Sequence, residues 1–196
     1  MPLHVAPAPA PALRSILTAL GSPTAVREAP VPALRAHQGP LSPDHPLPLH
    51  VWDDVSRADG TPHTRLAGWQ FLVRGGERAV ATAEAVLTAD GWTFGRFCGG
   101  PYVASTERAL AQSEALTTPY QPRLLSVPEL YMLTLWLHHD LSSDGAEGLP
   151  AAGDLLVPLA PAPPGIAAHR PHHVADLLPR LTLRLASAPL ELREPA

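Results

Sequence analysis

Two glycine-containing breaks divide residues 69–98 into three extended runs, and this pattern constrains the fold more than any other feature. The runs are Trp69–Val73, Ala79–Thr88 and Trp92–Cys98, and the breaks are Gly75-Gly76 and Asp90-Gly91. Glycine adopts a positive φ without steric cost and aspartate tolerates one, so an Asp-Gly turn between extended runs predicts a β-hairpin.

The middle run, Ala79–Thr88, places alanine and leucine on one face and Val, Thr and Glu on the other. The alanine face is smooth enough for a helix to approach closely, and the opposite face is half-solvated. A helix is the competing interpretation because alanine is a strong helix former. The flanking glycine breaks favour a strand.

The rest of the chain adds strands and two helices. Leu124–Val127 and Leu130–His138 are apolar on both faces, which fits a covered central strand, with a buried helix as the open alternative. Ser105 or Thr106 is expected to cap a helix ending near Leu116, and His172–Leu185 has the spacing of an amphipathic helix.

These elements predict an α+β fold with a mostly antiparallel, curved sheet packed on two helices, in the order β-β-β-β-α-β-β-β-α. The domain is expected over residues 48–188, followed by a tail at 189–196. The shape is analogous to cystatin-like or NTF2-like architectures, and no family resemblance is implied.

Residues 1–47 are expected to form a Pro/Ala-rich arm. Eleven of the chain's 25 prolines fall within residues 1–48. Inside the arm, residues 13–20 predict a short amphipathic helix whose apolar face consists of Leu13, Ile16, Leu17 and Leu20. About two turns of helix are unstable alone, so this segment must either dock on something or be mostly disordered. The chain's own core and a partner protein are the two candidates.

Composition excludes several functional classes. The chain contains no Lys and no Asn, a bias typical of a GC-rich bacterium, and its net charge is −4. Nucleic-acid binding needs clustered basic residues, and the arginines here are scattered. A single cysteine, Cys98, excludes an intrachain disulfide and favours a reducing cytoplasm. No apolar run reaches the roughly 18 residues needed to span a membrane.

No catalytic motif is recognisable, and neither a cofactor nor a metal site is predicted. His138 or His139 with Asp140, together with one of His169, His172 or His173, would hold zinc only if the two segments met, and the spacing matches no known zinc motif. Adjacent histidines on a strand point to opposite sides, so each pair is expected to offer one ligand. Cys98 most resembles a buried small side chain rather than a nucleophile.

The four tryptophans, Trp52, Trp69, Trp92 and Trp136, each fall in a predicted strand. A core position is the default for such residues, and Trp69, Trp92 and Trp136 with His138 are the candidates for lining a pocket under the curved sheet.

The leading functional hypothesis is a non-enzymatic intracellular protein that binds another protein or its own copy through Leu13, Ile16, Leu17 and Leu20, or that serves as an accessory subunit of a larger assembly. The alternative is an enzyme or small-molecule binder with a Trp/His-lined pocket, whose expected mark is a concave apolar cavity containing an inward His or Asp.

Overall fold

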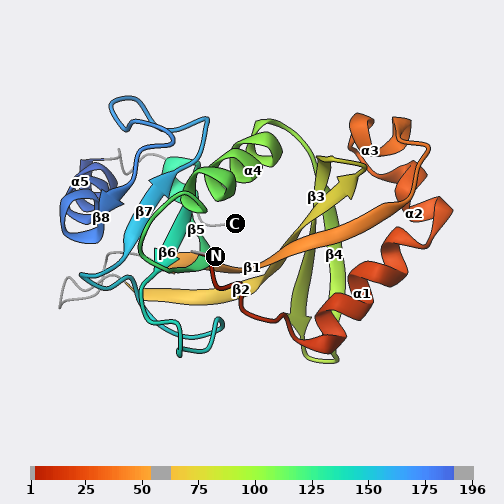
Figure 1. The fold of residues 1–196 in the computed structure, drawn as a ribbon, viewed down its shortest axis with the longest axis horizontal. Coiled ribbons are helices and arrows are strands. Elements are labelled where there is room, and N and C mark those ends of the chain that lie inside the picture. Colours follow the sequence, from red (N-terminus) through yellow and green to blue (C-terminus); the bar gives the residue numbers. More distant parts are fainter. Residues whose placement is uncertain (1–2, 54–62, 188–196) are drawn as a thin grey trace, which may run out of the picture.

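An eight-stranded sheet forms the centre of the computed structural model, which describes residues 3–53 and 63–187 (Figure 1). The strands lie in the order β4-β3-β2-β1-β5-β6-β7-β8. They are β1 (Leu41–Asp53), β2 (His63–Gly75), β3 (Arg78–Thr88), β4 (Gly91–Cys98), β5 (Gln121–Val127), β6 (Met132–His138), β7 (Leu155–Pro158) and β8 (His172–His173). Neighbours are antiparallel except β1 and β5, which pair in parallel. The predicted mostly antiparallel, curved α+β fold is confirmed.

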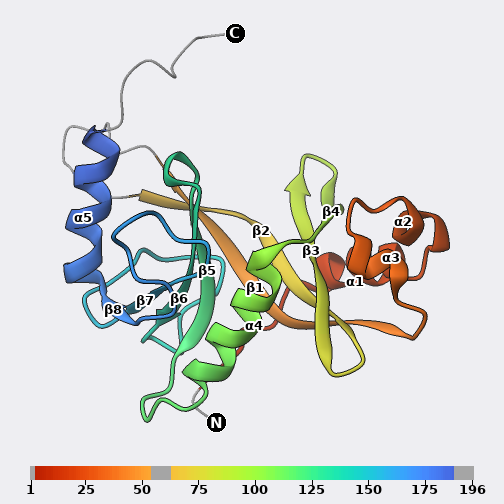
Figure 2. The ribbon, with the colours of Figure 1, turned by 90° about the horizontal axis from the view of Figure 1, so that it is seen from above.

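Helices cover both faces of this sheet. The described residues form α1 (Ala10–Leu20), α2 (Pro23–Glu28), α3 (Pro32–Ala36), α4 (Pro101–Ser113), α5 (Val174–Ser187) and the short 3-10 helix η1 (Pro128–Leu130). Figure 2 shows α1–α3 and α5 at opposite ends of the sheet, with α4 between them. α4 and α5 are the two predicted helices of the domain, and α1 contains the short helix predicted at residues 13–20. The proline-rich N-terminal segment adds α2 and α3, which were not predicted.

Neighbouring residues of a strand point to opposite faces of the sheet, and their packing shows that α4 lies on one face and the other helices on the other. Leu72 of β2 packs in one cluster with Ala109 of α4, whereas its neighbours Phe71 and Val73 pack in the cluster that contains Ile16 of α1. On β6, Leu135 packs on the α4 side and Trp136 on the α5 side. We call these the α4 face and the opposite face.

Strand β1 begins at Leu41, so it crosses the expected boundary between residues 47 and 48. Prolines 43, 46 and 48 lie within it. β2 pairs along almost the whole of β1, but β5 pairs only with Leu49–Val51. The proline-rich half of β1 therefore does not pair with β5. Along that edge, a proline that lacks an N–H removes no hydrogen bond between strands. Ile16 of α1, Leu34 of α3 and Val31, which precedes α3, are buried against the sheet.

The ambiguous segments are resolved. Leu124–Val127 lies in β5 and Met132–His138 forms β6, so both are strands. All four tryptophans lie in strands, as predicted. Gly91 has φ 109°, which confirms the expected turn chemistry.

The expected start of α4 was wrong: the helix begins at Pro101, because proline is favoured at the first helical position, and Gly100 precedes it with φ 99°. Thr106 lies inside the helix and donates to the Tyr102 carbonyl. The expected tail at residues 189–196 lies outside the described residues.

Candidate functional site

A groove of about 590 Å³ lies on the α4 face of the sheet. Residues of β2, β3 and β4 form one side, and the start of α4 and the β5–β6 hairpin form the other. Most of its lining is apolar, including Val86, Val103 and Leu133. Tyr131 also lines it while remaining 87% exposed, because this residue occupies the left-handed position that ends η1. The groove is thus open to solvent at the side formed by Tyr131.

A row of polar side chains crosses the groove between β2 and β4, centred on Glu84. The Glu84 carboxylate accepts hydrogen bonds from Gln70 Nε2 at 3.3 Å and from Arg96 Nε at 2.8 Å. The Glu84 side chain is 13% exposed and that of Arg96 is 70% exposed, so the ion pair runs from the groove wall to solvent. The hydrogen bond to Glu84 raises the pKa of Arg96.

The sequence builds this row through strand alternation. Glu84 lies between Ala83 and Ala85, which are fully buried on the opposite face in the cluster containing α1. This confirms the predicted smooth alanine face and the polar face opposite it. Gly68 pairs with Val86 in this region, and a Cβ at residue 68 would lie 2.3 Å from the Ala85 carbonyl oxygen. Any larger residue there would push β2 and β3 apart.

Cys98 completes the row as an inert thiol. Burial, and then the neighbouring Glu84 carboxylate, raise the pKa of Cys98 to about 11. The thiol donates to Glu84 Oε1 at 3.6 Å. Because the thiolate is the nucleophile, this raised pKa lowers the nucleophilicity of Cys98 at neutral pH.

The structure does not bring the four pocket candidates together. Trp69 borders the groove, but its indole belongs to the buried cluster under α1, and Trp92 is half-buried against the same cluster. Trp136 and His138 lie on the opposite face, with ring centroids 5.4 Å apart. No histidine or aspartate is found among the described residues that line the groove, so its charged groups are Glu84 and Arg96.

The four residues expected to bind a partner lie on α1 but on different sides of it. Ile16 is fully buried in the core, and Leu20 is half-buried. Leu13 and Leu17 remain 37% and 51% exposed. The chain's own sheet therefore occupies part of the predicted face, and Leu13 and Leu17 are left for a partner.

If the full chain associates with its own copy through Leu13 and Leu17, Leu17→Asp should break up the assembly. A full chain that elutes as an oligomer should become monomeric, because a carboxylate would be placed in an apolar contact. Thr18→Asp on the same exposed helix is the matched control and should leave the assembly unchanged. Size-exclusion chromatography with light scattering measures both. A monomeric full chain would rule out this role for α1.

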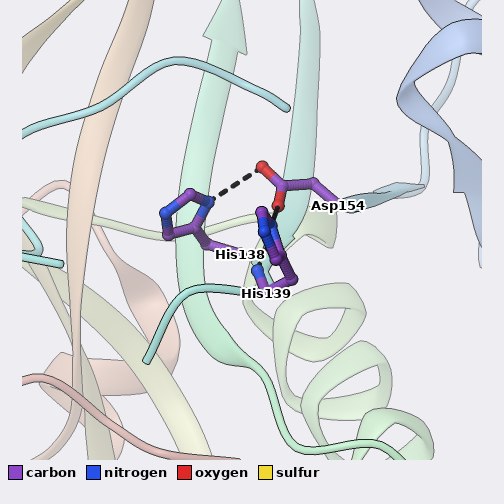
Figure 3. A group of neighbouring side chains, drawn as sticks. All are labelled: His138, His139 and Asp154. Atoms are coloured by element: carbon purple, nitrogen blue, oxygen red, sulfur yellow. Dashed lines mark hydrogen bonds and ion pairs between the residues drawn. The ribbon is translucent and has the colours of Figure 1, made fainter. Parts of the chain in front are cut away.

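A second polar cluster lies where β6 ends and β7 begins (Figure 3). Asp154 is fully buried and accepts from His138 Nδ1 at 2.9 Å and from His139 Nδ1 at 2.7 Å. Burial raises the pKa of Asp154, but hydrogen bonds from His138, the Ala151 amide and His139 outweigh this and hold it well below its usual range.

This arrangement corrects the expectation that adjacent histidines diverge. β6 ends at His138, so the alternation rule stops there and the turn at His139 brings both imidazoles to one carboxylate. The carboxylate is Asp154 rather than Asp140, whose side chain accepts from Ser142 instead. His169 contacts Ser105 Oγ at 3.2 Å.

Arg123 joins the loop at residues 139–153 to the opposite face of the sheet. Its guanidinium is fully buried and donates to Gln121 Oε1 at 2.7 Å, Ser143 Oγ at 2.6 Å and the Asp144 carbonyl at 3.0 Å. It also donates to the Glu147 carbonyl. Burial lowers its pKa, although the aspartates nearby act in the opposite direction.

His50 holds the same loop from β1. Its Nε2 lies 3.0 Å from the Gly145 carbonyl oxygen, so Nε2 carries the proton and donates. Burial, together with repulsion from Arg123 and His138, lowers the pKa of His50 to about 4, although the bond to Gly145 acts against this. A neutral, buried imidazole therefore fixes the loop at neutral pH.

Sequence reasoning missed Glu84, Arg123 and Asp154 as site residues. Each is a charged residue inside or beside an apolar strand run, as in Pro122-Arg123-Leu124 and Asp154-Leu155-Leu156. Charged residues are rarely buried unless they are paired, so a charged residue inside or beside an apolar strand run indicates a polar network.

The chain matches no known protein family, no curated protein and no solved structure. None of the described helices is both long and apolar enough to cross a membrane. Function therefore has to be inferred from the groove and from the two polar clusters.

Proposed function

We propose that this protein is a non-catalytic binding protein that holds a neutral, amphipathic small molecule in the groove on the α4 face. The observation that carries this proposal is a concave, mostly apolar cavity of about 590 Å³ with one convergent polar row. Sites for small molecules commonly enclose about 300–1,000 Å³ and combine apolar walls with a few polar groups that fix orientation.

The polar row favours a ligand with an uncharged head. Glu84 and Arg96 already neutralise one another at 2.8 Å. A charged head would lose hydration in the groove and find no unpaired opposite charge on either residue. A hydroxyl or amide can donate to the Glu84 carboxylate and accept from the exposed Arg96 guanidinium without that cost.

The same residues support binding rather than catalysis. The thiol of Cys98 is protonated at neutral pH, and the Glu84 carboxylate already accepts three hydrogen bonds, which leaves one of its roughly four acceptor sites for a ligand. General acid–base work needs a group whose pKa lies near the working pH and within reach of the substrate. The described groove residues with resolved pKa shifts, Arg96, Cys98 and Tyr102, are all shifted upward, away from neutral pH.

Filling the groove should abolish binding. Val86→Arg places a long side chain into it, and the dissociation constant for the neutral fluorescent probe Nile red should rise more than about tenfold. Leu87→Arg is the matched control, because residue 87 is 61% exposed and the next position along β3 faces the opposite side. Fluorescence titration of both variants measures the difference. Equal affinity in the two variants would place the probe elsewhere and overturn the proposal.

Competition against Nile red identifies the head group. Below their micellar concentrations, 1-monolauroylglycerol should displace the probe at a concentration about tenfold lower than laurate or dodecylammonium, which share its chain length. If laurate or dodecylammonium displaced the probe at the lowest concentration, the proposal of an uncharged head group would be wrong, although the groove would remain the binding site.

A further inference from the structure

We propose that His138, His139 and Asp154 form a binding site for a divalent transition-metal ion, with zinc as the best match. Their ligand atoms all lie within 4.8 Å of one another, and no other group of three such residues is found within residues 3–53 and 63–187. Imidazole nitrogen and carboxylate oxygen are ordinary zinc ligands. The site lies on the opposite face from the groove and does not depend on the proposed function.

The geometry needs little change to accept an ion. Nδ1 of His138 and of His139 already lie 2.9 and 2.7 Å from separate oxygens of Asp154. In a tetrahedral zinc site with bonds near 2.0–2.1 Å, neighbouring ligand atoms lie about 3.3 Å apart. An ion between them would draw the three ligand atoms, which now lie within 4.8 Å of one another, to about that spacing. Each imidazole would coordinate as the neutral ligand through Nδ1, with its proton on Nε2.

The carboxylate is also held by donors that metal binding would leave in place. Trp136 Nε1 donates to Asp154 Oδ2 at 2.6 Å, and the Ala151 amide donates to the same oxygen at 2.9 Å. The His139 amide donates to Oδ1 at 3.0 Å. Outer hydrogen bonds of this kind orient metal ligands, and losing one typically weakens metal affinity 10–100-fold.

Exposure gives the ion access and an open position. Asp154 and His138 are buried, whereas the side chain of His139 is 50% exposed. An ion on this cluster would have three protein ligands and one side toward solvent, where water completes the tetrahedron. Three protein ligands and a water are the arrangement of zinc sites that keep a coordination position open.

Metal titration of the full chain tests the site. After treatment with EDTA and buffer exchange, the protein should bind one equivalent of zinc by calorimetry, and cobalt(II) should give the visible absorption of a tetrahedral site. His139→Ala should weaken zinc binding more than about tenfold and abolish the cobalt spectrum. Because His139 is half-exposed, this variant is expected to fold, which circular dichroism checks.

His37→Ala is the matched control, since this partly exposed histidine follows α3 and lies with residues of the N-terminal helices, away from the cluster. It should bind zinc as the wild type does. Absence of stoichiometric binding, or equal affinity in His139→Ala, would overturn the metal site and leave a hydrogen-bonded clasp around Asp154. Equal losses in both variants would show adventitious binding to surface histidines and would overturn it as well.

Discussion

Arg123→Met is expected to lower the free energy of unfolding by at least about 1–3 kcal/mol, the cost of leaving one buried acceptor without its donor. Methionine fills much of the volume but donates no hydrogen bond. Gln121, Ser143 and the carbonyls of the loop would lose their donor while remaining next to the sheet. Unsatisfied buried acceptors are costly, so the loop should also open.

Urea unfolding at pH 7 measures the first effect, and hydrogen exchange of residues 143–148 measures the second. Arg14→Met provides the control, since Arg14 is exposed on α1 and surface substitutions usually change stability by less than about 0.5 kcal/mol. Similar stabilities for the two variants would show that the Arg123 network does not hold the loop.

Lowering the pH from 7 to 5 is expected to destabilise the protein by about 2 kcal/mol through His50 alone. The pKa of His50 is about 4 in the folded state, against 6.5 for the unperturbed group. Between these values the unfolded chain binds a proton that the folded chain does not. Stability from this group is therefore complete above about pH 6.5 and is lost as the pH falls toward 4.

Comparison with His50→Phe isolates that contribution, because phenylalanine keeps an aromatic ring and removes the titration. The decrease in the free energy of unfolding between pH 7 and pH 5 should be about 2 kcal/mol larger in the wild type than in the variant. His173→Phe, at an exposed histidine, should retain the wild-type difference. Parallel pH profiles for wild type and His50→Phe would contradict a buried neutral imidazole.

Local patterns in the sequence were enough to predict much of the sheet. The Asp90-Gly91 turn depends on the φ preferences of two residues, and the faces of Ala79–Thr88 depend only on strand alternation. Both are properties of neighbouring residues, and both are confirmed. The prediction that Leu130–His138 is a strand also held over Met132–His138.

The errors have tertiary causes. Residues 41–47 were assigned to the proline-rich arm but form the first half of β1, where the short reach of β5 makes the prolines acceptable. The cluster around Asp154 joins residues about fifteen positions apart through β6–β7 pairing, in which Trp136 lies opposite Leu156. The groove likewise combines β3, β4, α4 and the β5–β6 hairpin, and no single segment contains its pattern.

Backbone NMR of the full chain, titrated with 1-monolauroylglycerol below its micellar concentration, tests the proposed binding site most directly. Binding in the groove predicts amide shifts that saturate at Glu84, Arg96, Cys98 and Val103, with Leu13 and Leu17 on α1 unchanged. Shifts confined to α1, or no saturable shifts at all, would contradict a ligand site on the α4 face.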